Sequence, residues 1–254
     1  MGINEQSVAL LGVGLESITR QEVGGRLFGF LQGTKAALVV TPNPEMLVLA
    51  EKDPHFRKVL NSADLRLVDG FGLVLAAFLL GKKLVRFSGV DALHTLARQS
   101  ARGGKRLLLV GGMHNEDAPR AAENLARMYP GLLARGVGGG PITMDGEVWS
   151  GGEEIIRTIH EWQPHILAVS LGHGKQERWL AEHLKSFSSV RVGIGIGGAL
   201  EFLSGRQTRA PRWMRAFGLE WMYRLLCEPR RFRRIYHAVI LFPILVIRST
   251  LRSI

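Results

Sequence analysis

Short apolar runs alternate with longer helical stretches through most of this 254-residue chain. Each apolar run is bounded by turn residues, a pattern typical of strands that are buried on both faces. Strands that alternate with helices form a parallel sheet covered by helices on both sides. The sequence therefore predicts a Rossmann-like α/β fold with a mostly parallel sheet. The predicted strands are Val8–Val13, Ala37–Thr41, Leu65–Asp69, Arg106–Gly111, His165–Leu171 and Val190–Ile196, and the predicted helices are Thr19–Leu31, Asp91–Arg102, Asp117–Tyr129, Glu153–Trp162 and Lys175–Phe187.

The pattern changes after residue 197, where no further strand is expected. Predicted helices at Arg209–Phe217 and Leu219–Leu226 precede an uncharged apolar run, Ala238–Ile247. Residues 206–254 contain eleven Arg, two Glu and neither Lys nor Asp, a net charge of +9 out of +11 for the whole chain. We therefore predict an α/β domain over residues 1–197 and a helical, Arg-rich appendage over residues 198–254.

The arginines of the appendage indicate a partner that carries phosphate. A guanidinium group stays charged, and its planar fork pairs with phosphate oxygens. Nucleic acid, an anionic bilayer and a lipid pyrophosphate all fit. The pI of about 10.5 favours nucleic acid, but the charge lies beside an apolar run and no nucleic-acid recognition motif is present. A non-catalytic, membrane-associated protein that binds nucleotide sugars is a further alternative.

The apolar run also bears on where the protein works. Ala238–Ile247 is shorter than the roughly 18–20 residues of a membrane-spanning helix, so no transmembrane segment is expected. The run is expected either to lie in a bilayer interface or to pack on the body or on a second subunit. We expect no signal peptide, and the single cysteine, Cys227, suits a reducing compartment. These features favour a cytoplasmic protein on the inner face of the cell membrane, with homo-oligomerisation left open.

Turn residues follow five of the predicted strands. In parallel α/β sheets the ligand lies beyond the carboxyl ends of the strands, and glycine lets backbone N–H groups approach a phosphate closely. We therefore expect these turns to form one rim, with Gly112, Gly172 and Gly198 as backbone contacts; ordinary strand-to-helix turns are the alternative. No G-x-G-x-x-G sequence follows the first strand and no Walker A sequence is present. The five turns are Thr41–Pro44, Asp69–Gly70, Gly111–Gly112, Gly172–Gly174 and Gly195–Gly198.

Asp69 is the strongest candidate for chemistry. A carboxylate at the end of a buried strand is partly desolvated, which raises its proton affinity and suits a general base. The alternative is that Asp69 caps a helix over Phe71–Leu80. Thr41 and Asn43 offer short polar side chains on the neighbouring turn, although Asn43 is also placed to cap a helix over Pro44–Glu51.

A second candidate group opens the helix after Gly174. Lys175 and Gln176 lie in its first turn, where the helix dipole favours anions; a capped surface helix is the alternative. The sequence contains no H-E-x-x-H motif and no clustered His/Cys pattern, so we expect no metal ion and no cofactor.

These segments, in this order, resemble the WecG/TagA/CpsF family of bacterial glycosyltransferases (glycosyltransferase family 26). The resemblance covers the chain from Leu11 to about Arg234. The segments that carry it are Leu11–Gly14, Thr41–Met46, Ala63–Asp64, Val68–Gly72, Phe87–Asp91, Leu109–Gly112, Tyr129–Gly131, Leu171–Glu177, Gly195–Gly198, Arg209–Trp213, Gly218–Arg224 and Glu228–Arg230.

The resemblance implies an inverting, metal-independent transfer of an N-acetylmannosamine-type sugar from a UDP-sugar to a polyprenyl-pyrophosphate-linked amino sugar, in the synthesis of a cell-surface polysaccharide or teichoic acid. It implies that Asp69 is the general base, that Thr41 and Asn43 belong to the active site, and that Gln176 contacts the nucleotide. The appendage would bring the enzyme to the membrane and supply arginines to the diphosphate: Arg224, Arg230, Arg231, Arg233 and Arg234 are the candidates.

Two positions depart from the family pattern. Gly174 stands where the family usually has Pro, and Glu201 stands where it usually has Asp. Because Glu201 is a candidate for contact with the nucleotide, the donor sugar could differ from that of other members. Neither departure touches Asp69.

Overall fold

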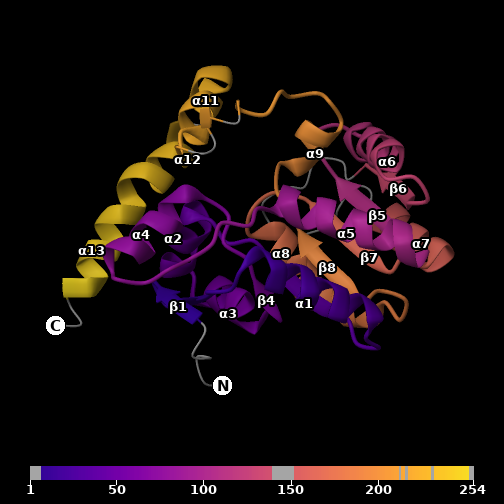
Figure 1. Ribbon diagram of the computed structural model, residues 1–254, viewed down its shortest axis with the longest axis horizontal. Helices are drawn as coiled ribbons and strands as arrows, with labels where there is room; N and C mark the ends of the chain where they lie inside the picture. Colours follow the sequence, from indigo (N-terminus) through magenta and orange to yellow (C-terminus); the bar gives the residue numbers. More distant parts are fainter. Residues whose placement is uncertain (1–6, 139–151, 212, 215–216, 230–231, 252–254) are drawn as a thin grey trace.

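A six-stranded sheet forms the centre of the protein (Figure 1). The computed structural model describes residues 7–138, 152–211, 213–214, 217–229 and 232–251. The strand order is β4-β3-β8-β7-β5-β6, and every pair of neighbours is parallel. The predicted α/β fold is thus confirmed. The strands are β3 (Ala37–Val40), β4 (Leu65–Arg66), β5 (Arg106–Gly111), β6 (Leu133–Val137), β7 (Ile166–Ser170) and β8 (Val192–Gly195).

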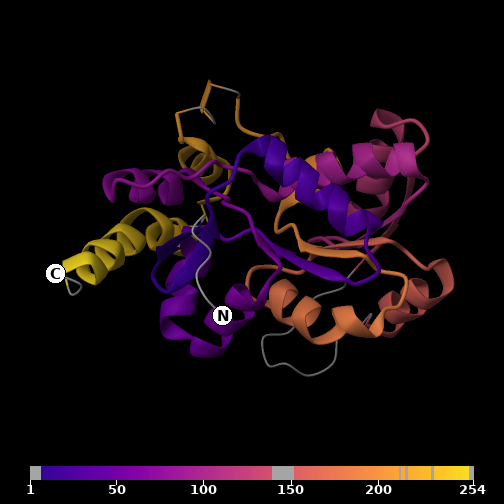
Figure 2. The same ribbon diagram turned by 60° about the horizontal axis from the view of Figure 1, so that its bottom comes forward.

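Helices cover both faces of this sheet (Figure 2). Strand side chains alternate between two apolar clusters, because successive residues of a strand point to opposite faces. One face carries α1 (Arg20–Gln32), α5 (Gly89–Gly103), α6 (Asp117–Met128) and α9 (Ala199–Leu203). The other carries α2 (Pro44–Lys52), α3 (Pro54–Ser62), α4 (Phe71–Leu79), α7 (Gly152–Trp162) and α8 (Lys175–His183), which continues into a 3-10 turn at Leu184–Ser186.

Two predicted strands differ from the structure. The run Val8–Val13 is not one strand but an antiparallel hairpin of β1 (Ser7–Leu10) and β2 (Val13–Glu16), separate from the main sheet. Leu11 and Gly12 form its turn with φ of 48° and 74°, the positive values that two-residue hairpins require. The strand predicted over Leu65–Asp69 ends at Arg66, and only a single bridge from Val68 to Arg86 prolongs the pairing.

Helix caps agree with the sequence at α1 and α2. Thr19 and Glu22 form the predicted capping box, and the Asn43 side chain accepts a hydrogen bond from Met46 N–H at 3.0 Å. The alternative role for Asp69 is wrong, because Gly70 is the N-cap residue of α4 and no side chain caps that helix. Gly70 has a φ of 124°, so the chain turns sharply just after Asp69.

The last part of the chain is helical, as predicted, over α11 (Glu220–Cys227) and a continuous twenty-residue helix, Phe232–Leu251, which we call the C-terminal helix. It comprises α12 (Phe232–Tyr236), a π-helical turn (His237–Leu241) and α13 (Phe242–Leu251). Of the helix predicted over Arg209–Phe217, the described residues are helical only at 213–214. Because the residue before a proline disfavours the α conformation, Pro211 explains why Ala210 is not helical.

The C-terminal helix packs on the body through one face only. Phe242 and Val246 are buried where this helix contacts α2 and α4, which agrees with the expectation that the apolar run packs on the body, and Ile235 is also buried. The opposite face is an exposed apolar row, the outer stripe: Phe232, Tyr236, Ile240, Ile244, Ile247 and Leu251.

The uncharged run Ala238–Ile247 is shorter than the helix that contains it, because the C-terminal helix continues past Arg234 and Arg248. By length and composition alone, this helix is long and apolar enough to cross a membrane.

Candidate active site

A pocket of about 1110 Å³ lies beyond the carboxyl ends of β3, β5, β7 and β8. All five predicted turns contribute to it, which is the rim that the sequence predicted. The pocket also reaches α11 and the C-terminal helix, so the appendage forms part of its wall. The predicted site residues that line it are Thr41, Asn43, Asp69, Gly112, Gly172, Gln176, Gly198, Glu201, Arg224 and Arg234.

Two other predicted residues within the described part of the chain are not brought into this pocket. Lys175 is half-buried and Arg233 is exposed, and neither lines the pocket. Arg230 and Arg231 lie outside the described residues. Among the described residues, the appendage therefore lines the pocket with Arg224 and Arg234, which were predicted, and with Arg209, which was not.

Asp69 lines the pocket, and charged side chains of both signs act on the pKa of its carboxyl. Burial raises the pKa of its carboxyl, and Glu220 adds to this, while the guanidinium groups of Arg86 and Arg224 and the N–H of Gly89 oppose it. The Asp69 backbone is held by a hydrogen bond from its N–H to the Pro42 carbonyl at 2.8 Å. A carboxylate fixed in this way can take a proton from a bound hydroxyl group.

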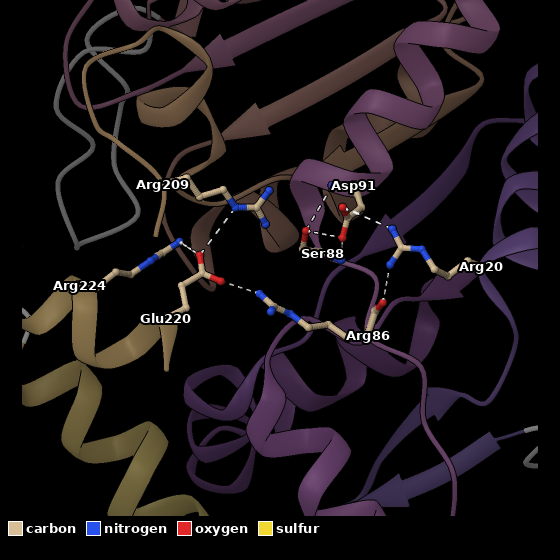
Figure 3. A network of polar contacts seen from close by, with 7 residues as sticks. All are labelled: Arg20, Arg86, Ser88, Asp91, Arg209, Glu220 and Arg224. Carbon is tan, nitrogen blue, oxygen red and sulfur yellow. Dashed lines mark hydrogen bonds and ion pairs between the residues drawn. The ribbon is translucent and has the colours of Figure 1, made fainter. Parts of the chain in front are cut away.

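Glu220 joins three arginines at the pocket wall (Figure 3). Its carboxylate lies 2.7 Å from Arg86, 3.3 Å from Arg224 and 3.9 Å from Arg209. Burial acts to raise the pKa of Glu220, but these three cations lower it below its usual value. The cluster thus presents a surplus of positive charge to the pocket in which Asp69 lies.

The backbone of Arg86 is braced from the other side (Figure 3). Arg20 donates a hydrogen bond to the Arg86 carbonyl at 2.9 Å and lies 3.4 Å from Asp91. Asp91 in turn accepts from the Ser88 hydroxyl at 2.8 Å in a capping box that starts α5. The position of Arg86 therefore depends on the start of a fifteen-residue helix rather than on a loop alone.

Thr41 and Asn43 make structural contacts in the described chain. The Thr41 hydroxyl donates to the Gly195 carbonyl at 3.1 Å and so ties the ends of β3 and β8 together. Asn43 caps α2, the role that the sequence offered as an alternative. Both side chains nevertheless line the pocket, and their part in catalysis stays a prediction.

Gln176 is buried and joins two rim loops. Its Oε1 accepts from the backbone N–H groups of Gly197 at 3.2 Å and Leu171 at 3.4 Å. Its Nε2 donates to the Glu177 carboxyl at 2.6 Å, and Glu177 also accepts from Gly174 N–H at 2.7 Å. A Cβ at Gly195 would lie 2.7 Å from Gln176 Nε2, so a larger residue there would displace the Gln176 side chain.

Replacing Glu177 with Gln is expected to remove a pH dependence of stability. Burial raises the pKa of Glu177 to about 7 from 4.5, although hydrogen bonds from Gln176 and Gly174 lower it. The folded state thus holds this proton more tightly than the unfolded state does. Stability should therefore be highest below the unfolded pKa and fall as pH rises through about 7, by ~3 kcal/mol at most.

The Glu177→Gln variant should lose about 1 kcal/mol with one hydrogen bond and show a flat profile across that window. Chemical denaturation over a pH series measures both quantities. A wild-type profile as flat as that of the variant would contradict the assignment.

Two further ion pairs, besides the one between Arg86 and Glu220, fasten the appendage to the body. Arg206 lies 2.7 Å from the buried carboxylate of Asp117 at the start of α6, and Arg234 lies 2.8 Å from Glu45 in α2. Asp117 also accepts a hydrogen bond from His114 N–H at 2.9 Å, in a loop that lines the pocket. The boundary between residues 197 and 198 stays a prediction; α9, which directly follows it, packs on α6.

The fold and the pocket together define an α/β protein whose pocket, at the carboxyl ends of the strands, carries a surplus of positive charge. The glycosyl transferase WecG/TagA/CpsF family matches residues 8–254 of the sequence. The chain belongs to this family and is a glycosyltransferase, which favours the catalytic hypothesis over the non-catalytic one.

Similar proteins carry the name N-acetylglucosaminyldiphosphoundecaprenol N-acetyl-beta-D-mannosaminyltransferase. One, from Bacillus spizizenii, is 33% identical over 207 residues, which cover 81% of this chain and 77% of that protein. Another, from Staphylococcus aureus, is 28% identical over 235 residues, which cover 91% of this chain and 89% of that protein.

Arg86 and Glu220 are pocket residues that sequence reasoning missed. Arg86 lies two residues before Ser88, which opens the Ser88–Asp91 capping box, a signal that marks a helix start but not a ligand. Glu220 is one of only two acidic residues among the eleven arginines of residues 206–254. An acidic residue in such a basic segment is a signal that could have indicated that Glu220 pairs with arginine.

Proposed function

We propose that this enzyme transfers an N-acetylmannosamine-type sugar from a UDP-sugar to a polyprenyl-pyrophosphate-linked N-acetylglucosamine, with inversion at the anomeric carbon. The names of the similar proteins support this donor sugar and this acceptor. The observation that carries the proposal is one pocket in which Asp69 faces Arg86 and Arg224.

In this reaction Asp69 takes the proton of the acceptor hydroxyl. The oxygen then attacks the anomeric carbon, and the bond from that carbon to the donor phosphate breaks as the new glycosidic bond forms. UDP leaves with the electron pair, and the arginines stabilise its developing charge. A single displacement of this kind inverts the anomeric carbon.

Metal independence is part of the proposal. The described residues contain no group of three or more His, Cys, Asp or Glu side chains placed to hold a metal ion. Arg86 and Arg224 instead offer fixed positive charge where a diphosphate would leave. Guanidinium groups can neutralise such charge without a metal ion.

A transfer assay tests the proposed reaction. Thermal shift against a panel of UDP-sugars identifies the donor, and transfer to a synthetic polyprenyl-pyrophosphate N-acetylglucosamine is then followed with and without EDTA. We expect a disaccharide product whose yield is unchanged by EDTA. Failure with every UDP-sugar would refute the donor class, and loss of activity in EDTA would refute metal independence.

We further propose that the enzyme works on the inner face of the cell membrane as a peripheral protein. The outer stripe presents apolar side chains along the C-terminal helix, and Arg233 and Arg248 are exposed beside it. Apolar residues next to basic ones suit the interface of an anionic bilayer, where each nearby Lys or Arg contributes about 1 kcal/mol.

Charge placed on the outer stripe should weaken membrane binding. Ile240→Glu and Ile247→Glu each remove an exposed isoleucine, whose burial is worth about 1.5–3 kcal/mol, so vesicle affinity should fall about tenfold or more. Sedimentation with vesicles that contain anionic lipid measures this. Ile156→Glu, at an exposed isoleucine of α7, is the matched control. Unchanged binding by both stripe variants would refute this surface.

A further inference from the structure

The pocket has an apolar end as well as a charged one. Where it enters the space between α4 and the C-terminal helix, it is lined by an apolar groove that consists of Phe71, Leu75, Ala238, Val239 and Pro243. These residues take no part in the proton transfer or in the stabilisation of charge described above. Their chemistry calls for an apolar ligand group.

The groove starts beside the charged end and leads away from it. Asp69 and Gly70 directly precede α4, and Arg234, which also lines the pocket, lies in the first turn of the C-terminal helix. Both helices therefore begin near the reacting groups. Figure 1 shows α4 and α13 side by side, and the two helices contact each other.

One face of α4 continues the groove toward the outside. Phe71, Leu75, Phe78 and Leu79 recur at the spacing of a single helix face, and all four are exposed, Leu79 by 74%. A soluble helix normally buries such a face. Here Phe71 and Leu75 line the pocket, and Phe78 and Leu79 continue the same face beyond it.

We propose that this groove binds the first isoprene units of the acceptor lipid. The inference rests on the proposed function and adds a binding site to it. Of the two substrates, only the acceptor joins a pyrophosphate directly to a long apolar chain. The pocket has the same order of chemistry, with Arg234 in the first turn of the C-terminal helix and the apolar residues Ala238, Val239 and Pro243 farther along the same helix. The nucleotide donor has no apolar part that would fill the groove.

Two water-soluble acceptors separate this site from membrane docking. Both carry the same pyrophosphate-linked sugar; one ends in a methyl group and the other in three isoprene units. In a buffer without vesicles or detergent, wild-type kcat/KM should be at least tenfold higher for the isoprenoid acceptor. The assay reports the ratio of the two values, so a general loss of activity does not affect it.

Polar substitutions in the groove should reduce this ratio. Leu75→Gln keeps the side-chain length at a position that is 45% exposed, and should bring the ratio close to one. Val239→Thr is nearly isosteric and should lower the ratio by a smaller factor. Ile244→Gln, on the outer stripe, is the matched control and should keep the wild-type ratio. Thermal unfolding checks that each variant is folded.

The outcomes distinguish the groove from the function on which it rests. If the wild-type enzyme uses neither acceptor, the proposed function fails. If it uses both with equal kcat/KM, or if Leu75→Gln keeps the wild-type ratio, the groove inference is wrong while the function stands. If Ile244→Gln lowers the ratio as much as Leu75→Gln does, the tail lies on the outer stripe and not in the groove.

Discussion

Replacing Asp69 with Asn is expected to lower kcat for sugar transfer by about 10²–10⁴ while the fold is retained. The carboxamide has the shape of the carboxyl group but cannot accept the proton of the acceptor hydroxyl. Because Asp69 does not cap α4, the substitution removes no helix cap. Initial rates with saturating donor and acceptor measure the loss, and turnover at the wild-type rate would remove Asp69 from the role of base.

Asp64→Asn is the matched control for this substitution. Asp64 is exposed and lies just before β4, at the opposite end of the segment that leads to Asp69. Its carboxylate accepts a hydrogen bond from Leu38 N–H at 2.8 Å, which the oxygen of Asn can also accept. We expect its transfer rate to remain at the wild-type value.

The pH profile gives an independent check on Asp69. A base must be ionised to act, so kcat/KM should rise with pH through the pKa of this carboxyl in the free enzyme. Burial raises that pKa, hence the acid limb should lie above the ordinary value of about 3.9 for Asp. The limb should be absent from the residual activity of Asp69→Asn. An acid limb that persists unchanged in the variant would belong to another group.

Local signals in the sequence were sufficient to locate five of the six strands of the central sheet. Strand β5 has the predicted bounds, Arg106–Gly111, because its apolar run is uninterrupted and both ends are marked by turn residues or charge. The capping box predicted at Thr19 and Glu22 is also present. Elements that depend on tertiary context were missed. Strand β6 (Leu133–Val137) lies at the sheet edge with Leu133 exposed, and it has no apolar run to reveal it.

The rim of the site could be predicted for a topological reason. Turns that follow parallel strands meet at one edge of the sheet, so Thr41, Asp69 and Gly198 could be placed together without any knowledge of distances. Arg86 and Glu220 could not be paired in that way. They are 134 residues apart, and only the docking of the appendage on the body brings them to 2.7 Å.

Arg86→Gln is expected to lower kcat/KM by about 10²–10³, the typical effect of removing one group that stabilises charge in the transition state. The acid limb should also move to higher pH, because the Arg86 guanidinium lowers the pKa of Asp69 against the effect of burial. Arg86→Lys should recover only part of the activity, since an ammonium group cannot form the paired contact of a guanidinium. Arg120→Gln, at an exposed arginine paired with Glu116, is the control.

A double variant decides how Arg86 acts. If Arg86 only neutralises Glu220, the loss in Arg86→Gln comes from the unbalanced carboxylate, and adding Glu220→Gln should restore most of the activity. If Arg86 stabilises the leaving diphosphate, the double variant should stay as slow as Arg86→Gln alone. We expect the second outcome, because Arg224 and Arg209 still lie within 3.3 Å and 3.9 Å of Glu220 when Arg86 is lost. The coupling energy from the four variants measures the difference directly.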